Sequence, residues 1–377
     1  MKKIFLLLIL VLFTCNNAYA DLVYTTTNGS LGYIDYESID ELTTYSNQFQ
    51  TGTSPIVTSY LLNGYVKVML INPFNTLSDW DQFYVFDGAN LTTPEHTDDL
   101  FFTGITGTTS IVTAVNADVT SVFLTSNQGV VAEYRAGETE PRNYYNYSDV
   151  TSDDAVALKS VISRERLFVL FNRHNEYLNQ DFHELLRFDG MLKKNSSFAS
   201  LDLGIAVNDV SVMSSGTVLA GFDGGIRKIS NKSYEDLLTD ENVTNIYVEN
   251  KQSFYTISKN ATNNTTTLSY YYDDVPEVIY SGTTGQCNTQ LLYDAKNKLL
   301  AAILCDGILV LDISDSTVEI SRFIPSSELG GIPNSVAFLG VSTITSNTSS
   351  SSSSGCNSIS MPFMGILLLG LIAKFKK

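Results

Sequence analysis

Three features of the sequence predict an all-β protein built from repeated four-stranded units. Residues 21–341 are filled with short alternating runs rich in β-branched and aromatic residues, of which Val66–Leu70 and Leu309–Ile313 are clear examples. No segment has a long apolar stripe of helical period, so helices are expected to be short at most. The runs recur in groups of four at a spacing of roughly 36 to 53 residues, which is typical of propeller blades.

Two groups show the repeat most clearly. The first comprises Asn288–Tyr293, Leu299–Leu304, Ile308–Ile313 and Val318–Phe323. The second comprises Val207–Met213, Thr217–Phe222, Gly225–Ile229 and a weaker fourth run before Leu238. The turns between first and second runs predict six complete groups, and they fall near Gly64, Ala117, Glu165, Ser215, Lys251 and Lys296.

A further blade is expected from the two ends of this region. Three runs lie within Asp21–Gln48, and one more lies within Asn334–Gly340. Pairing them in one sheet would close the ring and remove exposed sheet edges that favour aggregation. We therefore predict a seven-bladed β-propeller closed by its N- and C-terminal strands. Six or eight blades, or paired β-sandwiches, are the alternatives.

The N-terminal segment has the three parts of a secretory signal peptide. Two lysines precede the apolar run Ile4–Phe13, and Ala18 and Ala20 form a small-x-small cleavage site. Cleavage after Ala20 would remove residues 1–20. A lipoprotein signal at Cys15 is the alternative, although the residues before it are larger than such signals prefer.

The C-terminal end combines a spacer, a Gly-Cys pair, an apolar segment and a basic end. The Ser-rich segment 342–357 contains Gly355 and Cys356 and is expected to be a flexible spacer. Residues 358–377 include an apolar stretch, Met361–Ala373, that is shorter than the ~20 residues needed to span a bilayer as a straight helix. This order resembles the cysteine-containing, Synergistes-type sorting tails of bacterial surface proteins. The resemblance implies cleavage near Gly355 and Cys356 and attachment to the cell surface.

The two end segments together predict an extracytoplasmic protein at the cell surface or associated with the outer membrane. A eukaryotic GPI signal is the alternative for the tail, although such signals normally end apolar and this one ends in lysine. Asn-x-Ser/Thr acceptors compatible with that route occur at Asn28, Asn90, Asn146, Asn195, Asn231, Asn242, Asn260, Asn263, Asn264 and Asn347.

The charge balance argues against nucleic acid as a partner. The net charge is −17, and five of the 23 basic residues lie in the two end segments, which contain no Asp or Glu. The region between them therefore carries 18 basic and 40 acidic residues, a net charge of −22. A surface this acidic repels phosphate backbones and anionic lipid. Contact with a membrane is expected through the C-terminal tail only.

Two of the four cysteines, Cys287 and Cys305, lie between the end segments. If Cys287–Tyr293 and Leu299–Cys305 form a hairpin that turns at Lys296, the two sulfurs face each other across it. Directly opposed residues in a non-hydrogen-bonded pair can meet disulfide geometry. We therefore predict a disulfide in an oxidising compartment. Two small buried thiols are the alternative.

Three connections between second and third strands are expected to be long and to rise from one face: Asn72–Asp81, Asn172–His183 and Ser258–Thr266. Long loops on a rigid scaffold are where function concentrates. A tryptophan beside two carboxylates in the first loop could stack on a sugar or a cation, or instead cap the blade. The candidate ligand-binding residues are Asp79, Trp80, Asp81, Arg173, His174, Tyr177 and His183.

The sequence predicts no metal, no cofactor and no catalytic residue. His174, Asp181, His183 and Glu184 match no known metal-ligand spacing. Nucleophile elbows, zinc-binding helices, P-loops and dinucleotide fingerprints are all missing. We therefore expect a binding scaffold for a protein or glycan partner rather than an enzyme. An extracytoplasmic hydrolase or lyase with a site in the central channel, and a structural surface-layer or adhesion component, are the alternatives.

Overall fold

The computed structural model describes residues 21–339 apart from 36–41, 46–54, 64, 74–80, 100–106, 117–118, 139, 150–153, 164–165, 176–177, 179, 189–191, 193–197, 231–232, 286, 296 and 315–317. These residues form strands β1 to β26 and one 3-10 turn, η2 (Tyr147–Asp149). The predicted all-β class is confirmed. None of the described helical turns is long and apolar enough to cross a membrane.

The first three sheets, A to C, each contain four antiparallel strands. Sheet A comprises, in spatial order, β26 (Pro333–Leu339), β1 (Asp21–Thr26), β2 (Leu31–Ile34) and β3 (Leu42–Tyr45). Sheet B comprises β4 (Ile56–Leu62), β5 (Tyr65–Asn72), β6 (Gln82–Asp87) and β7 (His96–Asp99). Sheet C comprises β8 (Thr108–Asn116), β9 (Val119–Ser126), β10 (Val130–Arg135) and β11 (Asn143–Asn146).

The remaining strands form two four-stranded sheets and one larger sheet. Sheet D comprises β12 (Asp154–Ser163), β13 (Arg166–Asn175), β14 (Gln180–Phe188) and β15 (Phe198–Asp202). The six strands of sheet E are β16 (Asp209–Val212), β17 (Val218–Ser230), β18 (Ser233–Val248), β19 (Ser253–Asn260), β20 (Thr265–Tyr272) and β21 (Val275–Thr283). Sheet F comprises β22 (Gln290–Asp294), β23 (Leu299–Leu304), β24 (Gly307–Asp312) and β25 (Glu319–Pro325).

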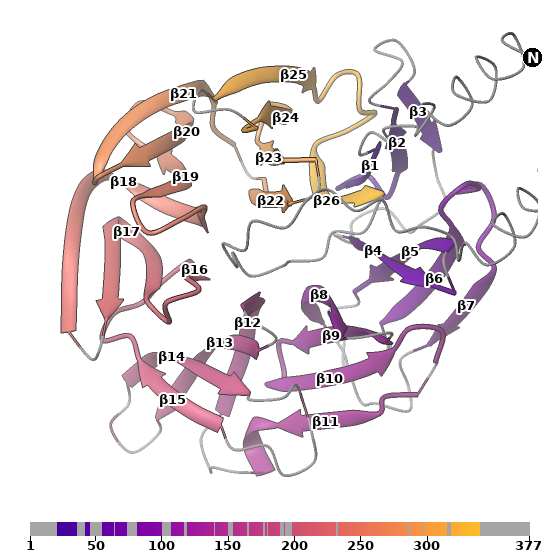
Figure 1. The fold of residues 1–377 in the computed structure, drawn as a ribbon, viewed down its shortest axis with the longest axis horizontal. Coiled ribbons are helices and arrows are strands. Elements are labelled where there is room, and N and C mark those ends of the chain that lie inside the picture. The colour runs from indigo at the N-terminus through magenta and orange to yellow at the C-terminus, as the bar shows by residue number, and fades with distance from the viewer. Residues whose placement is uncertain are drawn as a thin grey trace, which may run out of the picture. The chain divides into compact units, whose positions relative to one another are not determined.

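The sheets follow one another around a common centre, which is the β-propeller arrangement that the sequence predicts (Figure 1). The first strand of each sheet is innermost. Contacts join β4 to β8, β8 to β12 and β12 to β16 in turn, β22 contacts β18 of sheet E, and β26 contacts both β4 and β22. Hydrogen bonds from backbone N–H groups to side chains join these inner strands. Three examples are Val57 N–H to Ser335 Oγ (3.2 Å), Ser160 N–H to Ser110 Oγ (3.3 Å) and Val336 N–H to Gln290 Oε1 (3.0 Å).

The predicted pairing of the N- and C-terminal strands is observed. β26 and β1 are antiparallel neighbours, with Leu22 opposite Phe338 and Asp21 opposite Leu339. The indigo and yellow ends of the described chain therefore meet in sheet A (Figure 1). We call the edge of the ring at which β26 ends and β1 begins the terminal edge. In antiparallel sheets the turns between second and third strands lie at the opposite edge, which we call the hairpin edge.

The predicted count of seven separate blades differs from the sheets observed. Five sheets have four strands each, and sheet E has six. The difference arises because β17 and β18 each count as one strand, of 13 and 16 residues, although β17 pairs first with β16 and then with β18. The runs in the sequence predict turns within both segments.

The core lies between successive sheets, so central strands are covered on both faces. All six side chains of β23, Leu299–Leu304, are buried. One apolar cluster joins Met69 and Phe83 of sheet B to Leu124 and Tyr134 of sheet C. Burial on both faces explains why some strands read as continuous apolar runs rather than alternating ones.

Candidate functional site

The β13–β14 hairpin carries most of the candidate residues that the structure describes. The sequence predicts a long loop over Asn172–His183, but strand pairing continues up to Asn175 and Gln180. The connection therefore spans only residues 176–179. Polar side chains on both faces of this stretch hide the alternation of a strand, which is why the sequence suggested a loop.

The two other loops expected to be long have different outcomes. Strands β19 and β20 continue to Asn260 and from Thr265, so the expected loop Ser258–Thr266 is a four-residue connection, Ala261–Asn264. Most of the expected loop Asn72–Asp81 lies outside the described residues. Its Asp79 and Trp80 fall there, as does Tyr177 of the β13–β14 connection.

Asp81 is described, and it is not open to a ligand. Its side chain is 0% exposed. Its Oδ1 accepts the Gly107 N–H (2.9 Å), and its Oδ2 accepts the Thr108 N–H (2.6 Å) and the Thr108 hydroxyl. Because Thr108 begins β8, this carboxylate ties the start of sheet C to sheet B. The expectation that Asp81 contacts a ligand is corrected by this burial.

His174 and Asp181 form a polar pair near the hairpin edge of sheet D. They lie directly opposite each other on β13 and β14, and His174 Nδ1 is 2.7 Å from Asp181 Oδ1. The two side chains are 44% and 62% exposed. The pair is therefore open to solvent and to a partner.

His183 lies on the same face, two residues beyond Asp181, but its ring is half-buried. Its Nδ1 accepts the Val207 N–H at 3.2 Å, so the proton of the neutral imidazole lies on Nε2. Burial lowers the pKa of His183, although the nearby Asp181 carboxylate opposes this shift. The ring is therefore neutral at pH 7 and holds the crossover from β15 to β16 in place.

We expect part of the folding stability to be lost on acidification because of His183. Its folded pKa lies below the unfolded value near 6.5, so the unfolded chain binds more protons between these two values. The free energy of unfolding therefore rises with pH across this window and falls on acidification. Urea unfolding at pH 5, 6 and 7 gives the free energy of unfolding at each pH. This free energy should change less steeply with pH in His183→Gln than in wild type. The exposed His96→Gln is the control, and equal slopes for wild type and His183→Gln would contradict the assignment.

Arg173 faces the opposite side of the hairpin, where it belongs to a polar network between sheets C and D. Its guanidinium lies over the Phe182 ring, 5.2 Å from the centroid. Close by, the Tyr147 hydroxyl donates to Glu184 Oε2 (2.7 Å), and the Ser200 hydroxyl donates to Glu184 Oε1. Burial and the Glu184 carboxylate raise the pKa of Tyr147, which is therefore a neutral donor. Arg173 thus stabilises the hairpin close to its tip.

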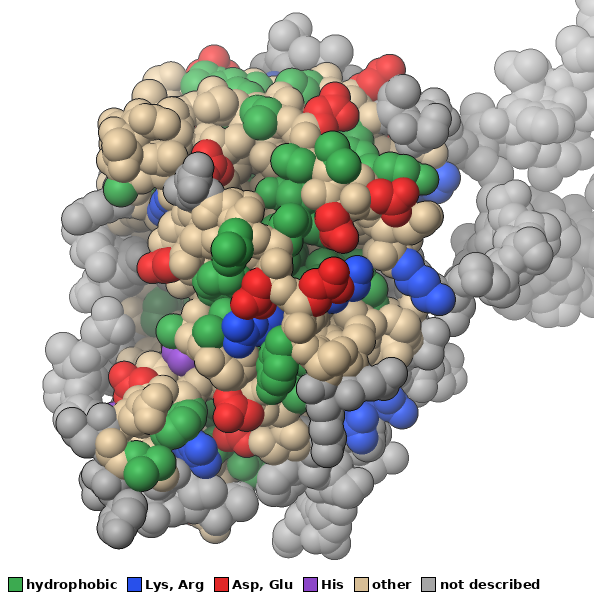
Figure 2. All heavy atoms as spheres, turned by 90° about the vertical axis from the view of Figure 1, so that its left-hand side faces the viewer, with side chains coloured by type: hydrophobic (Ala, Val, Ile, Leu, Met, Phe, Trp, Pro, Cys, Tyr) green, Lys and Arg blue, Asp and Glu red, His purple; other side chains and the backbone are tan. Residues whose placement is uncertain are grey.

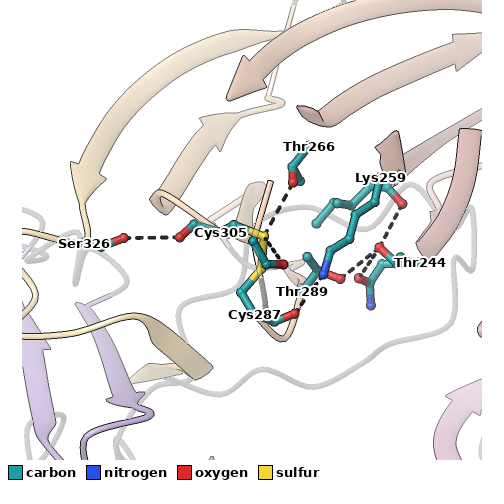
Figure 3. The surroundings of a disulfide bond; sticks show 10 residues. Thr244, Lys259, Thr266, Cys287, Thr289, Cys305 and Ser326 are labelled. Carbon is teal, nitrogen blue, oxygen red and sulfur yellow. Dashed lines mark hydrogen bonds between the residues drawn. A yellow bond between two sulfur atoms is a disulfide. The ribbon is translucent and has the colours of Figure 1, made fainter. Parts of the chain in front are cut away.

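The predicted disulfide between Cys287 and Cys305 is present, with a Cα–Cα distance of 5.2 Å (Figure 3). The two residues are not directly opposed, because the β22–β23 register places Gln290 opposite Ile303 and so Asn288 opposite Cys305. Both cysteines lie just outside the paired strands. The bond joins the β21–β22 crossover to the turn between β23 and β24.

A lysine and several hydroxyls surround the disulfide (Figure 3). Lys259 Nζ donates to the Cys287 carbonyl (2.8 Å), and burial lowers the pKa of this lysine. The hydroxyls of Thr244 and Thr289 are 2.9 Å apart and join β18 to the crossover before β22. This cluster could not be predicted from the sequence, because its members are far apart along the chain and belong to no motif. Within the described residues, no group of three or more His, Cys, Asp or Glu could hold a metal ion.

Known proteins resemble this chain in structure but not in sequence. No protein family and no curated protein matches it. A "putative 6-phosphogluconolactonase" from Bacteroides fragilis is 10% identical with a TM-score of 0.56, and the match covers 87% of this chain and 99% of that one. A functionally unknown protein from Desulfotomaculum acetoxidans is 10% identical with a TM-score of 0.53, covering 85% and 98%. These similarities show the fold alone.

Proposed function

We propose that this protein is an extracytoplasmic, surface-attached binding scaffold that presents its hairpin edge to a protein or glycan partner. The observation that carries the proposal is the β13–β14 hairpin. Nine consecutive residue pairs hold it rigid from Leu167 to Asn175, yet Leu178 at its tip is 59% exposed. A rigid element that ends in an exposed apolar side chain, flanked by the polar pair His174 and Asp181, has the composition of a contact site.

The position of the chain ends supports this orientation. β26 ends at Leu339, directly opposite Asp21 at the start of β1. Both lie at the terminal edge, whereas the β13–β14 tip lies at the hairpin edge. A chain attached to the cell surface through a segment that follows Leu339 would therefore turn its hairpin edge outward. The sorting tail and the signal peptide remain part of this proposal.

The scaffold is further proposed to have seven functional blades, because β17 folds back on itself. The Thr217 and Ser230 hydroxyls are 2.9 Å apart, although Thr217 precedes the 13-residue strand β17 and Ser230 is its last residue. A single extended strand of that length would separate its ends by roughly 40 Å. The chain reverses at Asp223 and Gly224, where Gly224 has a φ of 99° that suits a tight hairpin turn.

The contact between β16 and β18 supports the same count. Ile246 N–H donates to Asp209 Oδ2 (2.9 Å), and Val248 N–H donates to Ser211 Oγ (3.2 Å). This is the pattern of backbone-to-side-chain bonds that joins inner strands of separate sheets, such as Val57 to Ser335. Sheet E then consists of two blades of four strands, and the second half of β18 is an inner strand.

Photo-cross-linking from the hairpin tip tests the proposed function. The full chain, with a photoreactive residue in place of Leu178, is expected to give a cross-linked protein partner in its producing cells. Leu238, which is 75% exposed but lies on β18 of sheet E, is the matched control position. If the partner is a glycan, a glycan array should instead give hits that Leu178→Ser weakens about tenfold and Leu238→Ser leaves unchanged. Equal cross-linking from both positions, or neither cross-linking nor a Leu178-dependent array signal, would refute the proposal.

A further inference from the structure

The hairpin edges of neighbouring sheets lie on the same side of the ring. Val57 N–H donates to Ser335 Oγ. Two residues further along β4, the Ser59 hydroxyl donates to the Phe338 carbonyl, so β4 and β26 run in the same direction. The same order of contacts joins β8 to β12, β16 to the second half of β18, and β22 to β26. The turns between second and third strands, and the crossovers to the next sheet, therefore meet at one edge.

The connections at the hairpin edge contain carboxylates but neither lysine nor arginine. They are residues 27–30, 46–55, 73–81, 100–107, 127–129, 147–153, 176–179, 203–208, 261–264, 284–289, 305–306 and 326–332. Their acidic residues are Asp79, Asp81, Asp149, Asp153, Glu176, Asp306 and Glu328. The connections at the terminal edge contain Arg142, Arg164, Lys193, Lys194, Lys232, Lys251, Lys296 and Lys298. Charge is therefore distributed unequally between the two edges of the ring.

Side-chain exposure shows the same difference among the residues that the structure describes. The exposed Lys and Arg side chains all lie at the terminal edge, and they are Arg135, Arg142, Arg166, Lys251 and Lys298. The exposed carboxylates of the hairpin edge are Asp149, Asp181, Asp202, Asp223 and Glu328. Within the described part of the chain, none of these carboxylates forms an ion pair with Lys or Arg.

The basic side chains near the hairpin edge point away from these carboxylates. Arg173 lies over the Phe182 ring, and Lys259 Nζ donates to the Cys287 carbonyl. The outer strands of sheet E differ, since Figure 2 shows acidic and basic side chains next to one another there. One such pair is Arg227 and Asp236, joined by two hydrogen bonds of 2.7 Å. Carboxylates are thus neutralised on that side of the ring but not at the hairpin edge.

We propose that the partner of the hairpin edge is a basic protein, which places Lys and Arg side chains against these carboxylates around the apolar contact at Leu178. The inference rests on the proposed function and narrows its partner from a protein or glycan to a protein surface rich in lysine and arginine. Opposite charges of this kind speed association and select the partner.

Other ligand classes fit this edge less well. The carboxylates belong to different sheets, and no described group of three or more acidic, His or Cys residues could hold a metal ion. Anionic lipid and phosphate-bearing ligands are repelled by a region of net charge −22. A neutral glycan would leave the carboxylates without a counter-charge.

A dodecapeptide of lysine with one central leucine tests the proposal, because it offers both kinds of contact. Fluorescence anisotropy of the labelled peptide with the full chain should show binding at about 50 mM NaCl. At about 300 mM NaCl the Kd should rise roughly tenfold, because salt screens exposed charges. No binding of the lysine peptide at low salt, or equal binding of the corresponding glutamate peptide, would overturn the proposal.

Two variants that remove the same number of charges locate the binding edge. The hairpin-edge variant combines Asp149→Asn, Asp181→Asn, Asp202→Asn and Asp223→Asn. The terminal-edge variant combines Glu138→Gln, Glu140→Gln, Asp273→Asn and Glu319→Gln, all exposed at the other edge. Exposed ion pairs are individually weak, so we expect the hairpin-edge variant to raise the Kd about tenfold and the terminal-edge variant less than about twofold. Equal effects would mean that net charge alone attracts the peptide, and the proposal would fail.

Photo-cross-linking from position 178 separates this inference from the proposed function. The cross-link to the partner in the producing cells should weaken in the hairpin-edge variant and stay unchanged in the terminal-edge variant. A cross-link that the hairpin-edge variant keeps, or a neutral glycan as the ligand, would overturn the inference and leave the proposed function standing. The absence of any signal that depends on Leu178 would refute both.

Discussion

Asp81→Ala is expected to lower the free energy of unfolding by about 4 kcal/mol, because it leaves two buried N–H groups without a hydrogen-bond acceptor. The carboxylate is 0% exposed and accepts the Gly107 and Thr108 N–H groups and the Thr108 hydroxyl. Alanine leaves these donors without an acceptor and opens a small cavity between sheets B and C. Chemical denaturation at pH 7 measures the change.

Asp81→Asn distinguishes the contribution of the hydrogen bonds to stability from that of the negative charge. The amide keeps one carbonyl oxygen for the Thr108 N–H but turns a donor towards Gly107, so we expect a loss of about 2 kcal/mol, between wild type and alanine. Thr109→Val is a nearby control that removes a half-buried hydroxyl without touching Asp81. If Asp81→Ala lowers the free energy of unfolding by less than about 1 kcal/mol, the anchoring role is contradicted. If the variant loses ligand binding without loss of stability, Asp81 is instead the ligand-binding residue that the sequence predicts.

The strands themselves could be predicted because their signals are local. The alternating runs placed Leu299–Leu304 and Leu31–Ile34 within predicted strands, and the turn signals at Gly64 and Ser215 fall between paired strands. The pairing of β1 with β26 could also be predicted, because three strands at one end and one at the other complete a four-stranded unit. The β-propeller arrangement follows from that repetition.

The rest depends on contacts between residues that are far apart in sequence. Polar residues at 172–175 suggest a loop, yet His174 and Arg173 find partners on β14 that keep them in a strand. The segment that contains Asp81 has the composition of a surface loop. The structure shows instead that Asp81 is buried and accepts a hydrogen bond from Gly107, which is distant in sequence. No spacing in the sequence encodes these neighbours.

The disulfide shows how a correct pairing can rest on approximate geometry. Counting from a turn at Lys296 brings Cys287 and Cys305 together, but the observed register is displaced by one residue. The bond still forms because both cysteines lie beyond the paired strands, where the backbone is not held by the ladder. It therefore adds a constraint where strand pairing has ended, and its removal should be costly.

Removing the Cys287–Cys305 bond is expected to lower the free energy of unfolding by about 3 kcal/mol. The bond closes a loop with a sequence separation of 18, and a loop of that size reduces the entropy of the unfolded chain by about this amount. The double variant Cys287→Ser, Cys305→Ser should unfold at lower urea concentration, with an m-value that is equal to or larger than that of wild type because its unfolded chain is less compact. The bond links the β21–β22 crossover to sheet F, so this region should become the first to exchange its amide hydrogens.

A reductant provides the control for this prediction. Dithiothreitol should destabilise the wild-type protein to the level of the double variant and leave the double variant unchanged. If the entropy of the closed loop is the main contribution, the reduced wild type and the double variant should unfold at the same urea concentration. Equal stability of the oxidised and reduced wild type would contradict the prediction, since the crossover would then be held by contacts such as Lys259 to the Cys287 carbonyl and Thr244 to Thr289.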